Sequence, residues 1–337
     1  MKVMLLAIGG GGDIISTAVL SRSLMRQNIK TVIASIAWER YINDPSPGPL
    51  RLDEIVNFVE KKEGYILIDG RSYAVRGGYK VIFQAARVSE ALNEKIYIID
   101  LYGGVNGYVK SIREIVAKEG IDLIIGVDVG GDSIAVGCEE GLWSPLADWM
   151  GLSALHVVKG KLALHSPGSD GELEQQYLLS RIDHIASKGG LLGIRLLCES
   201  DAKLLENILE RASTEASLIS LLAYRGRRGE LTLRGGTRKV TLSFLSTLTF
   251  LLDTNIVIED IRPARELTDT KSIYEANKLL NAYGIYTELD FEEDLARANI
   301  KPYELSADLV MRIRKSGKER VAKSAMINYC REVNKSP

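Results

Sequence analysis

Four consecutive glycines and an aspartate, residues 9–13, lie between an apolar segment and a stretch with helical spacing. Because glycine has no Cβ, a ligand can approach the backbone amides at a helix N-terminus closely. No Lys-Ser or Lys-Thr follows, so the segment is not a P-loop, and it also departs from the GxGxxG dinucleotide fingerprint. We interpret Gly10, Gly11 and Gly12 as ligand-binding residues; the alternative is a tight turn in which Asp13 caps the helix.

A similar pattern recurs at residues 128–132, Asp-Val-Gly-Gly-Asp, after the apolar segment 123–127. Gly130 and Gly131 are expected to let the backbone come close to a ligand. Asp128 stands near the end of an apolar strand, where a carboxylate is either buried with hydrogen-bond partners or faces a ligand. The two glycine-rich segments therefore predict two strand ends that flank one crevice, and the alternative is two independent capped turns.

The acids in these loops predict the chemistry of the crevice. We expect Asp13, Asp128 and Asp132 to be catalytic, one of them as a general base, and Asp128 and Asp132 to be metal ligands. Glu139 or Asp148 could join them. Clustered carboxylates compete with a bare phosphate at a helix N-terminus, so they favour a divalent cation, sugar hydroxyls or an amine. A phosphate bridged by Mg²⁺ would suit both the glycines and the acids.

Two charged residues follow the second predicted strand. Glu39 lies near the place where dinucleotide-binding folds put the acid that holds a ribose hydroxyl. Arg40 is expected to bind the ligand by neutralising a phosphate. A second basic segment, residues 234–238, could add positive charge, and the alternative for it is a solvated hairpin turn.

Two further loops at predicted strand ends complete the candidate site. Their ligand-binding candidates are Gly103 and Gly104 in one loop and Ser166, Gly168 and Ser169 in the other. The serine hydroxyls and backbone amides of the second loop would make a polar cradle. The alternative for this loop is an ordinary turn before a helix that Ser169 or Asp170 caps.

Short apolar runs alternate with stretches of helical spacing, which is typical of repeated βα units around a buried parallel sheet. The predicted strands are residues 3–8, 31–37, 65–69, 95–100, 123–127 and 162–165, and the predicted helices are 14–27, 52–62, 81–92, 109–119 and 173–188. The fold class is therefore α/β, with a doubly wound, mostly parallel, Rossmann-like sheet. Such sheets bind ligands beyond the carboxyl ends of their strands.

The second half of the chain is richer in helices. Residues 201–212 and 215–224 have helical patterns, residues 230–234 and 238–243 read as a hairpin, residues 247–252 could return to the sheet, and further helices are expected at 273–282 and 307–328. Ser272 is the predicted cap of the first of these last two helices. We expect a Rossmann-like core over residues 1–255 and a helical C-terminal part over 256–337 that packs on it.

Composition narrows the class of protein. The 337 residues include 43 Lys and Arg against 44 Asp and Glu, a net charge of −1, so neither nucleic acid nor an anionic membrane is an expected partner. No apolar run is long enough for a membrane helix. Three cysteines without a CxxC pair and three histidines without HExxH argue against disulfides and zinc, and fit a reducing cytoplasm. Cys138 is interpreted as a small buried hydrophobic residue.

The motifs taken in order are Gly9 to Asp13, Trp38-Glu39-Arg40 with Asp44-Pro45 and Pro47-Gly48-Pro49, Asp128 to Asp132, and Ser166 to Glu172. This series resembles an uncharacterised, mainly archaeal family that is known only as a domain of unknown function. The resemblance extends over most of the chain, including residues 286–290. It implies an archaeal cytosolic origin and supplies no reaction.

Three hypotheses for the function follow. The first is an enzyme that acts on a nucleotide, a sugar phosphate or a similar small polar metabolite, assisted by Mg²⁺. The second is a non-catalytic sensor or assembly subunit that binds such a ligand and changes its oligomeric state as a homo-oligomer. The third is an NAD(P)-dependent oxidoreductase, which the broken GxGxxG pattern disfavours. The sequence has no Gly-x-Ser-x-Gly motif for nucleophilic catalysis.

Overall fold

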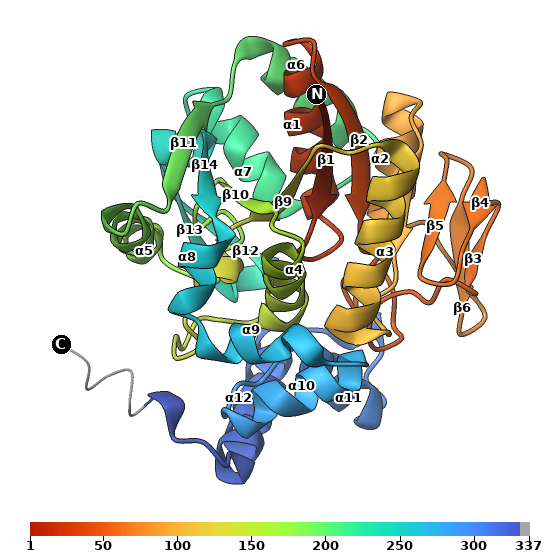
Figure 1. The fold of residues 1–337 in the computed structure, drawn as a ribbon. Coiled ribbons are helices and arrows are strands. Elements are labelled where there is room, and N and C mark those ends of the chain that lie inside the picture. Colours follow the sequence, from red (N-terminus) through yellow and green to blue (C-terminus); the bar gives the residue numbers. More distant parts are fainter. Residues whose placement is uncertain (331–337) are drawn as a thin grey trace.

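The computed structural model describes residues 1–330, and a nine-stranded sheet forms its centre (Figure 1). The strands lie in the order β11-β14-β10-β9-β1-β2-β8-β5-β4. Their bounds are β1 (Lys2–Ala7), β2 (Lys30–Ser35), β4 (Glu60–Lys61), β5 (Tyr65–Ile68), β8 (Ile96–Ile99), β9 (Leu123–Val129), β10 (Lys161–His165), β11 (Leu191–Leu196) and β14 (Leu248–Asp253). Every strand predicted in the first half of the chain is present in this sheet, and β4 and β11 are additions that the pattern did not predict.

The centre of the sheet is parallel and its edges are antiparallel. β1 pairs in parallel with β2 and β9, β9 with β10, and β2 with β8. β14 lies between β10 and β11 and runs against both, and β5 runs against β8. The protein thus has the predicted α/β fold with a mostly parallel central sheet.

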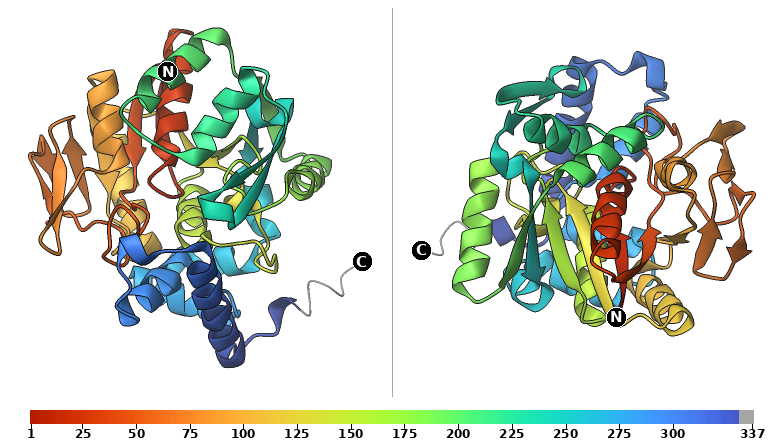
Figure 2. Two further views of the ribbon diagram at one scale, coloured as in Figure 1. Left: turned by 180° about the vertical axis from the view of Figure 1, so that it is seen from behind. Right: turned by 90° about the horizontal axis from the view of Figure 1, so that it is seen from above.

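Helices cover both faces of the sheet, so the central strands are mostly apolar. One face carries α1 (Asp13–Met25), α2 (Gln84–Leu92), α6 (Glu199–Leu209) and α7 (Glu215–Tyr224), and the other carries α3 (Gly104–Glu119) and α4 (Pro145–Val157). The view from behind in Figure 2 brings α1 and α7 to the front, whereas α3 and α4 are in front in Figure 1. The helix α5 (Gln175–Ser187) lies beside β11 at one edge.

Most of the C-terminal helices pack on the layer formed by α3 and α4, and the last one, α12, packs on α10 and α11 (blue in Figure 1). They are α8 (Thr254–Glu259), α9 (Arg262–Glu266), α10 (Ile273–Ala282), α11 (Glu288–Arg297) and α12 (Ala307–Ser324). The Ser272 hydroxyl accepts a hydrogen bond from the Glu275 amide, 3.0 Å away, which confirms the predicted cap of α10. The last residues of the predicted C-terminal part, 331–337, lie outside the described residues.

Two small sheets complete the fold. β3 (Ile55–Val56), β6 (Tyr73–Arg76) and β7 (Tyr79–Val81) form one, and β12 (Gly229–Leu233) and β13 (Arg238–Leu242) form the predicted hairpin. The helix predicted over residues 52–62 is wrong, because this stretch contains β3 and β4. Over so few residues the apolar spacing fits both periods, and pairing with β6 and β5 decides the outcome.

A disulfide joins Cys138 to Cys330 across a sequence separation of 192 residues, with the two Cα atoms 5.4 Å apart. The expectations that the chain carries no disulfide and that Cys138 is simply a buried hydrophobic residue are therefore wrong. Spacing along the chain could not show a pairing between such distant residues. Cys198 is a free, exposed cysteine. The disulfide also removes the cysteine-based reason for a reducing compartment.

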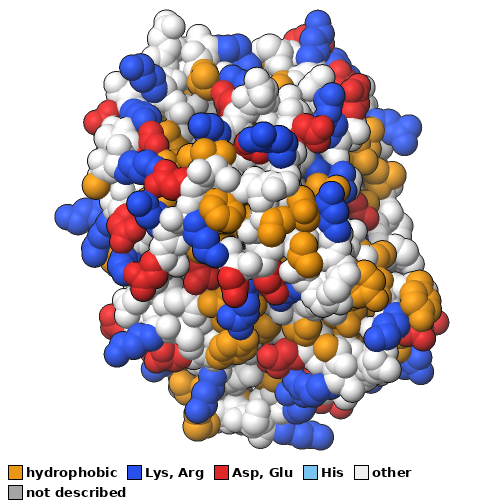
Figure 3. All heavy atoms as spheres, turned by 90° about the vertical axis from the view of Figure 1, so that its right-hand side faces the viewer, with side chains coloured by type: hydrophobic (Ala, Val, Ile, Leu, Met, Phe, Trp, Pro, Cys, Tyr) orange, Lys and Arg blue, Asp and Glu red, His pale blue; other side chains and the backbone are white. Residues whose placement is uncertain are grey.

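The surface agrees with the near-zero net charge. Figure 3 shows basic and acidic side chains interspersed over one face, with apolar side chains between them. Over residues 1–330 we find no helix that is both long and apolar enough to cross a lipid bilayer.

Candidate functional site

Three loops meet beyond the carboxyl ends of β1, β9 and β10. These strands are neighbours, and hydrogen bonds join the loops that follow them. The Val129 amide donates to Asp13 Oδ2 over 3.3 Å, and the Gly168 amide donates to the Gly130 carbonyl over 2.7 Å. The residues 9–13, 128–132 and 166–172 therefore form one continuous loop surface at the edge of the sheet where α/β folds bind ligands.

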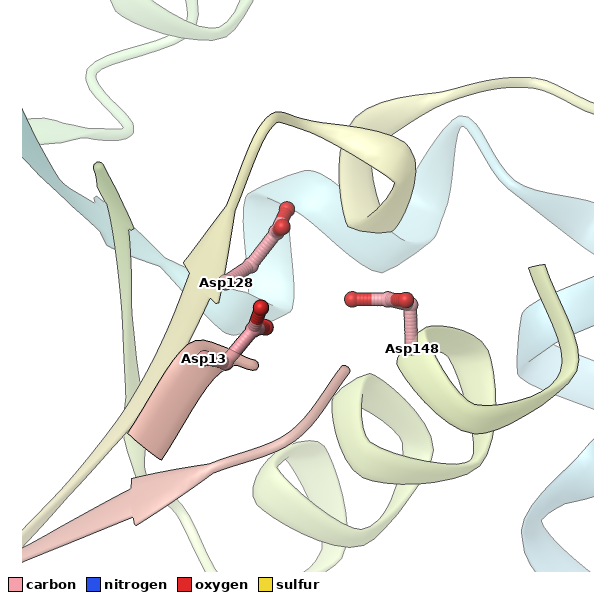
Figure 4. Close-up of side chains that lie close together, drawn as sticks. All are labelled: Asp13, Asp128 and Asp148. Carbon is pink, nitrogen blue, oxygen red and sulfur yellow. The ribbon is translucent and has the colours of Figure 1, made fainter. Parts of the chain in front are cut away.

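Three aspartates converge on one point of this surface, and we call Asp13, Asp128 and Asp148 the first acid group. One carboxylate oxygen of each lies within 4.8 Å of the others, and all three side chains are buried. Figure 4 shows that Asp13 and Asp128 point toward Asp148, which reaches them from α4 on the opposite side. The spacing suits ligands of one hard cation, whose oxygen ligands lie about 2.0–2.6 Å from the ion.

Each member of the first acid group is held differently. Gly12, not Asp13, is the N-cap of α1, and no side chain caps this helix, so the alternative of an Asp13 cap is wrong. Asp128 accepts hydrogen bonds from the amides of Gly131 and Ser133 and from the Ser133 hydroxyl. Asp148 Oδ1 is buried and has no hydrogen-bond partner in the described part of the chain.

The C-terminal helices help to place Asp148. Glu288 at the start of α11 accepts hydrogen bonds from the amides of Leu146 and Ala147, over 3.0 and 2.8 Å. These amides belong to the first turn of α4, which has no acceptor within its own helix. The contact fixes the N-terminal turn of α4, and Asp148 lies in that turn.

The electrostatics of the first acid group disfavour three bare carboxylates. Burial, followed by the neighbouring Asp128 carboxylate, raises the pKa of Asp13 well above its usual value, and burial with Asp128 and Asp13 does the same for Asp148. Burial also raises the pKa of Asp128 to about 6, although its hydrogen bonds to Ser133 act in the opposite direction. A divalent cation would stabilise the ionised form of all three.

A second acid group, Asp132, Asp170 and Glu172, lies beside the first. Its carboxylate oxygens also lie within 4.8 Å of one another. Glu172 forms a buried ion pair with Arg238 over 2.9 Å and accepts hydrogen bonds from the amides of Trp143 and Ser144. The predicted metal pair Asp128 and Asp132 is thus divided between the two groups.

The members of the second acid group differ in charge. Burial would raise the pKa of Glu172, but the Arg238 guanidinium and the hydrogen bond from the Ser144 hydroxyl act against it, and the pKa is lowered to about 2. Burial and the neighbouring Glu172 and Asp170 carboxylates raise the pKa of Asp132 well above its usual value. Burial and Glu172 raise the pKa of Asp170 to about 6. The positive charge of Arg238 therefore balances the negative charge of Glu172 much better than it balances that of Asp132 or Asp170.

The glycines of the first loop have distinct surroundings. A Cβ on Gly9 would lie 2.4 Å from Asp13 Oδ2 and 2.9 Å from Asp148 Oδ1, so Gly9 makes room for the first acid group. Gly10 is exposed and its Cβ would meet nothing within 4 Å. Gly11 and Gly12 approach the Trp38 carbonyl and the Thr214 hydroxyl instead. Of the predicted ligand-binding glycines in this loop, Gly10 is the one that borders open space.

The glycines of the second loop are required by the backbone. Gly130 and Gly131 have φ of +129° and +124°, values that side chains rarely adopt. A Cβ on Gly130 would lie 2.5 Å from Asp170 Cγ, and one on Gly131 would lie 2.7 Å from Leu178 Cδ2. Gly130 therefore brings the second acid group against the end of β9, and Gly131 packs against α5.

Glu39 and Arg40 lie close to the site but make contacts of their own. Glu39 is buried and accepts a hydrogen bond from the Gln84 amide over 2.9 Å, at the start of α2. Arg40 is exposed and pairs with Glu215 over 3.0 Å, and Arg234 pairs with the same carboxylate over 3.2 Å. Burial and the nearby Arg238 and Arg40 lower the pKa of Arg234 to about 9, so three guanidinium groups gather here.

Of the remaining predicted ligand-binding residues, those of one loop lie away from the acid groups and those of the other belong to the site. Gly103 and Gly104 begin α3, where a Cβ would meet the backbone of Gly107 and of Thr270 respectively, and not the acids. Ser166 and Ser169 have fully buried hydroxyls without a hydrogen-bond partner in residues 1–330. Gly168 joins this loop to Gly130. The N-cap of α5 is Glu174, so the predicted cap at Ser169 or Asp170 is wrong.

The site includes residues for which the sequence predicts a different role or none. Asp170 is expected at most to cap a helix, Glu172 has no predicted role, and Arg238 lies in the basic segment 234–238, which is expected to add positive charge or to form a solvated turn. Ser144, whose hydroxyl lies 3.0 Å from Asp132 Oδ2 and 2.5 Å from Glu172 Oε1, precedes a helix that was not predicted. Glu139 accepts from the amides of Val136 and Gly137 in its own loop and joins neither acid group.

Fold and site together define an α/β protein with two adjacent groups of buried acids at the carboxyl end of a parallel sheet. The chain belongs to the family described as "Protein of unknown function (DUF1152)", whose sequence model matches residues 4–296. This confirms the resemblance to an uncharacterised family. No curated protein and no solved structure matches the chain.

Proposed function

We propose that this protein is an enzyme that acts on a nucleotide, a sugar phosphate or a similar small polar metabolite, with a divalent cation such as Mg²⁺ held by the first acid group. The observation that carries the proposal is Asp148 Oδ1, a buried carboxylate oxygen without a hydrogen-bond partner among residues 1–330. Burying such an atom unpaired is costly, so its position beside two further carboxylates supports a ligand that it would coordinate.

The donor set fits a hard cation. Three carboxylates and no histidine or cysteine make up the first acid group, and oxygen ligands suit Mg²⁺, Ca²⁺ or Mn²⁺ better than softer metals. When bound, such a cation would polarise a substrate oxygen and lower the pKa of bound water. Asp13, Asp128 and Asp148 would hold it, and the hydrogen bonds from Gly131 and Ser133 would orient the Asp128 carboxylate.

Arginines near the first loop support an anionic substrate. Arg40 and Arg234 share the single carboxylate of Glu215, so the two guanidinium groups carry more positive charge than this partner compensates. Guanidinium groups bind phosphate through paired hydrogen bonds. In the proposed enzyme they hold the phosphate of the substrate while Gly10 lets it approach the backbone.

The other two hypotheses receive less support. In the oxidoreductase hypothesis Glu39 would bind a ribose, but its carboxylate already accepts from the Gln84 amide at the start of α2. The sensor hypothesis shares the ligand with the enzyme hypothesis and differs in two expectations, the absence of product and a change of oligomeric state on binding. Measurements of cation binding and of product formation therefore distinguish the enzyme from the sensor.

The experiment measures cation binding first and turnover second. Calorimetric titration with Mg²⁺ or Mn²⁺ should show binding to the wild-type protein, a loss of at least tenfold in affinity for Asp148→Asn, and no change for Asp183→Asn, an exposed aspartate on α5. A panel of nucleotides and sugar phosphates is then followed by ³¹P NMR with the cation present. Cation-dependent product supports the enzyme; ligand binding without product supports the sensor; no cation binding refutes the proposed site.

A further inference from the structure

We infer that the second acid group, Asp132, Asp170 and Glu172, binds a second divalent cation, so that the site is binuclear and its substrate presents phosphoryl oxygens to both cations. This second site rests on the proposed function of the first acid group and adds the class of substrate group that the two cations would hold. One carboxylate oxygen of each of the three residues lies within 4.8 Å of the others, the spacing expected of ligands to one ion.

An unpartnered atom again points to a ligand. Asp132 is 3% exposed, and its Oδ1 has no hydrogen-bond partner in the described part of the chain. The hydroxyls of Ser166 and Ser169, on the same loop as Asp170, are likewise fully buried and unpartnered within residues 1–330. Buried polar atoms of this kind are rare in folded proteins and call for an ion or water that satisfies them.

The balance of charge also favours a second cation. Among residues 1–330, Arg238 is the one basic residue in ion-pair contact with the second acid group, and it contacts Glu172. Asp132 and Asp170 therefore have no ion-pair partner of their own among these residues, and they lie beside the three carboxylates of the first group. One divalent cation leaves most of this buried negative charge in place, and a phosphate would add more, whereas two cations nearly balance the acids.

The backbone brings the two groups together. Asp128 and Asp132 belong to one turn, whose residue Gly130 has φ of +129°. Because Gly130 has no side chain, the Asp170 carboxyl carbon approaches to 2.5 Å from the position that a Cβ would occupy. Two neighbouring cations suit a phosphoryl group, since they can stabilise both the attacking and the leaving oxygen of a displacement.

A proton could replace the cation, and this alternative has a different consequence. The Ser144 hydroxyl lies between Asp132 Oδ2 and Glu172 Oε1, at 3.0 and 2.5 Å, and it has a single hydrogen to donate. A proton on Asp132 would complete the hydrogen bonds without any ion. In that case the protein binds one cation per chain, and a variant at Asp170 binds the same number as the wild type.

The test counts Mn²⁺ ions bound per chain, by calorimetry and by electron paramagnetic resonance of the full-length protein. The wild type should bind two and give the broadened signal of magnetically coupled ions. Asp170→Asn and, separately, Asp148→Asn should each bind one and give the signal of an isolated ion. The exposed control Asp183→Asn should bind two.

The outcomes separate the second site from the proposed function. One ion in the wild type that is lost in Asp148→Asn and kept in Asp170→Asn overturns the second site and leaves the first intact. No ion in any variant overturns both. Circular dichroism checks that each variant folds, and Asp132→Asn replaces Asp170→Asn if the latter does not. The expected result for Asp132→Asn is likewise the loss of one of two ions.

Discussion

Asp13 and Asp148 approach each other over Gly9, whose missing side chain leaves room for both carboxylates. A Cβ at this position would lie 2.4 Å from Asp13 Oδ2 and 2.9 Å from Asp148 Oδ1. We expect Gly9→Ala to displace at least one of these carboxylates and to weaken Mn²⁺ binding at least tenfold, because the methyl group would occupy the space between them. Calorimetric titration measures the change.

Gly10→Ala is the matched control for this prediction. Gly10 neighbours Gly9, neither residue has a positive φ, and a Cβ on Gly10 would meet nothing within 4 Å. We expect this variant to bind Mn²⁺ as the wild type does. Equal weakening in both variants would show that the effect comes from the stiffness of the loop and not from the two carboxylates.

Asp148→Asn should stabilise the protein when no divalent cation is present. The substitution removes one of three converging buried carboxyl groups, whose ionised forms repel one another. With EDTA at pH 7 we expect the free energy of unfolding of the variant to be higher than that of the wild type, because the raised pKa of Asp148 is a cost to the folded state that the variant lacks. Thermal unfolding with EDTA and with excess Mg²⁺ measures it. A variant less stable than wild type in EDTA would contradict the repulsion between these groups.

The ion pair between Glu172 and Arg238 should be sensitive to the loss of one partner. Both side chains are at most 2% exposed, and their charged atoms are 2.9 Å apart. Arg238→Met leaves the Glu172 carboxylate buried without its partner, and breaking such a pair costs about 3–5 kcal/mol. Urea unfolding should show this loss, and the double variant with Glu172→Gln should recover part of it. A loss under 1 kcal/mol would mean that water or another residue takes over the pairing.

Glu292 makes the stability of the protein depend on pH. Its carboxylate accepts hydrogen bonds from Trp38 Nε1 and the Gly48 amide, and burial raises its pKa from 4.5 to about 8. Between these two values the folded chain keeps a proton that the unfolded chain releases. The contribution of Glu292 to the free energy of unfolding is therefore complete below about pH 4.5 and is lost as the pH rises through 8. Over this range the free energy of unfolding falls by at most about 1.4 kcal/mol per pH unit.

Glu292→Gln removes this titration and keeps a polar side chain beside Trp38. Urea unfolding at pH 5, 7 and 9 should show a smaller fall in stability for the variant than for the wild type. Part of the fall should remain, because burial also raises the pKa of Glu39 to about 7 and that of Glu288 to about 8. Parallel curves for the two proteins would show that Glu292 titrates normally.

The sequence was sufficient to predict that the loops meet. It was insufficient to predict which acidic residues belong to the first acid group and which to the second. Apolar strands that end in glycine placed Asp13 and Asp128 at the carboxyl ends of β1 and β9, which are neighbours in the sheet. The two positive φ values at Gly130 and Gly131 then turn the chain so that Asp132 joins Asp170 and Glu172. Such a turn is a property of the backbone that residue types alone do not specify.

The contribution of Asp148 depends on a helix that sequence patterns did not show. α4 is buried on nearly all sides, because α3, α8, α9 and β9 surround it, so its sequence is mostly apolar and lacks a polar stripe. For Glu39, in contrast, the sequence pattern suggested a binding role that its observed contact does not support. Its position after β2 suggested a ribose ligand, whereas its partner is the Gln84 amide, 45 residues away. Long-range contacts of this kind decide between a binding role and a structural one.

The disulfide between Cys138 and Cys330 should stabilise the fold measurably, since it closes a separation of 192 residues. Met326 and Ile327 donate to the Ala282 carbonyl, and Tyr329 packs edge to face on Tyr283 at 5.4 Å, so other contacts also hold this segment. We expect Cys330→Ser to lower the free energy of unfolding by about 2–4 kcal/mol, mainly because the unfolded chain gains freedom.

Dithiothreitol provides the matched control for the disulfide. It should lower the stability of the wild type to that of Cys330→Ser and leave the variant unchanged, because Cys198 has no disulfide to lose. Titration of thiols in urea should find one per chain in the oxidised wild type and three after reduction. Three thiols without reductant, together with equal stability of wild type and variant, would mean that the two sulfurs are neighbours and not bonded. The helices around Tyr283 would then retain the segment by packing alone.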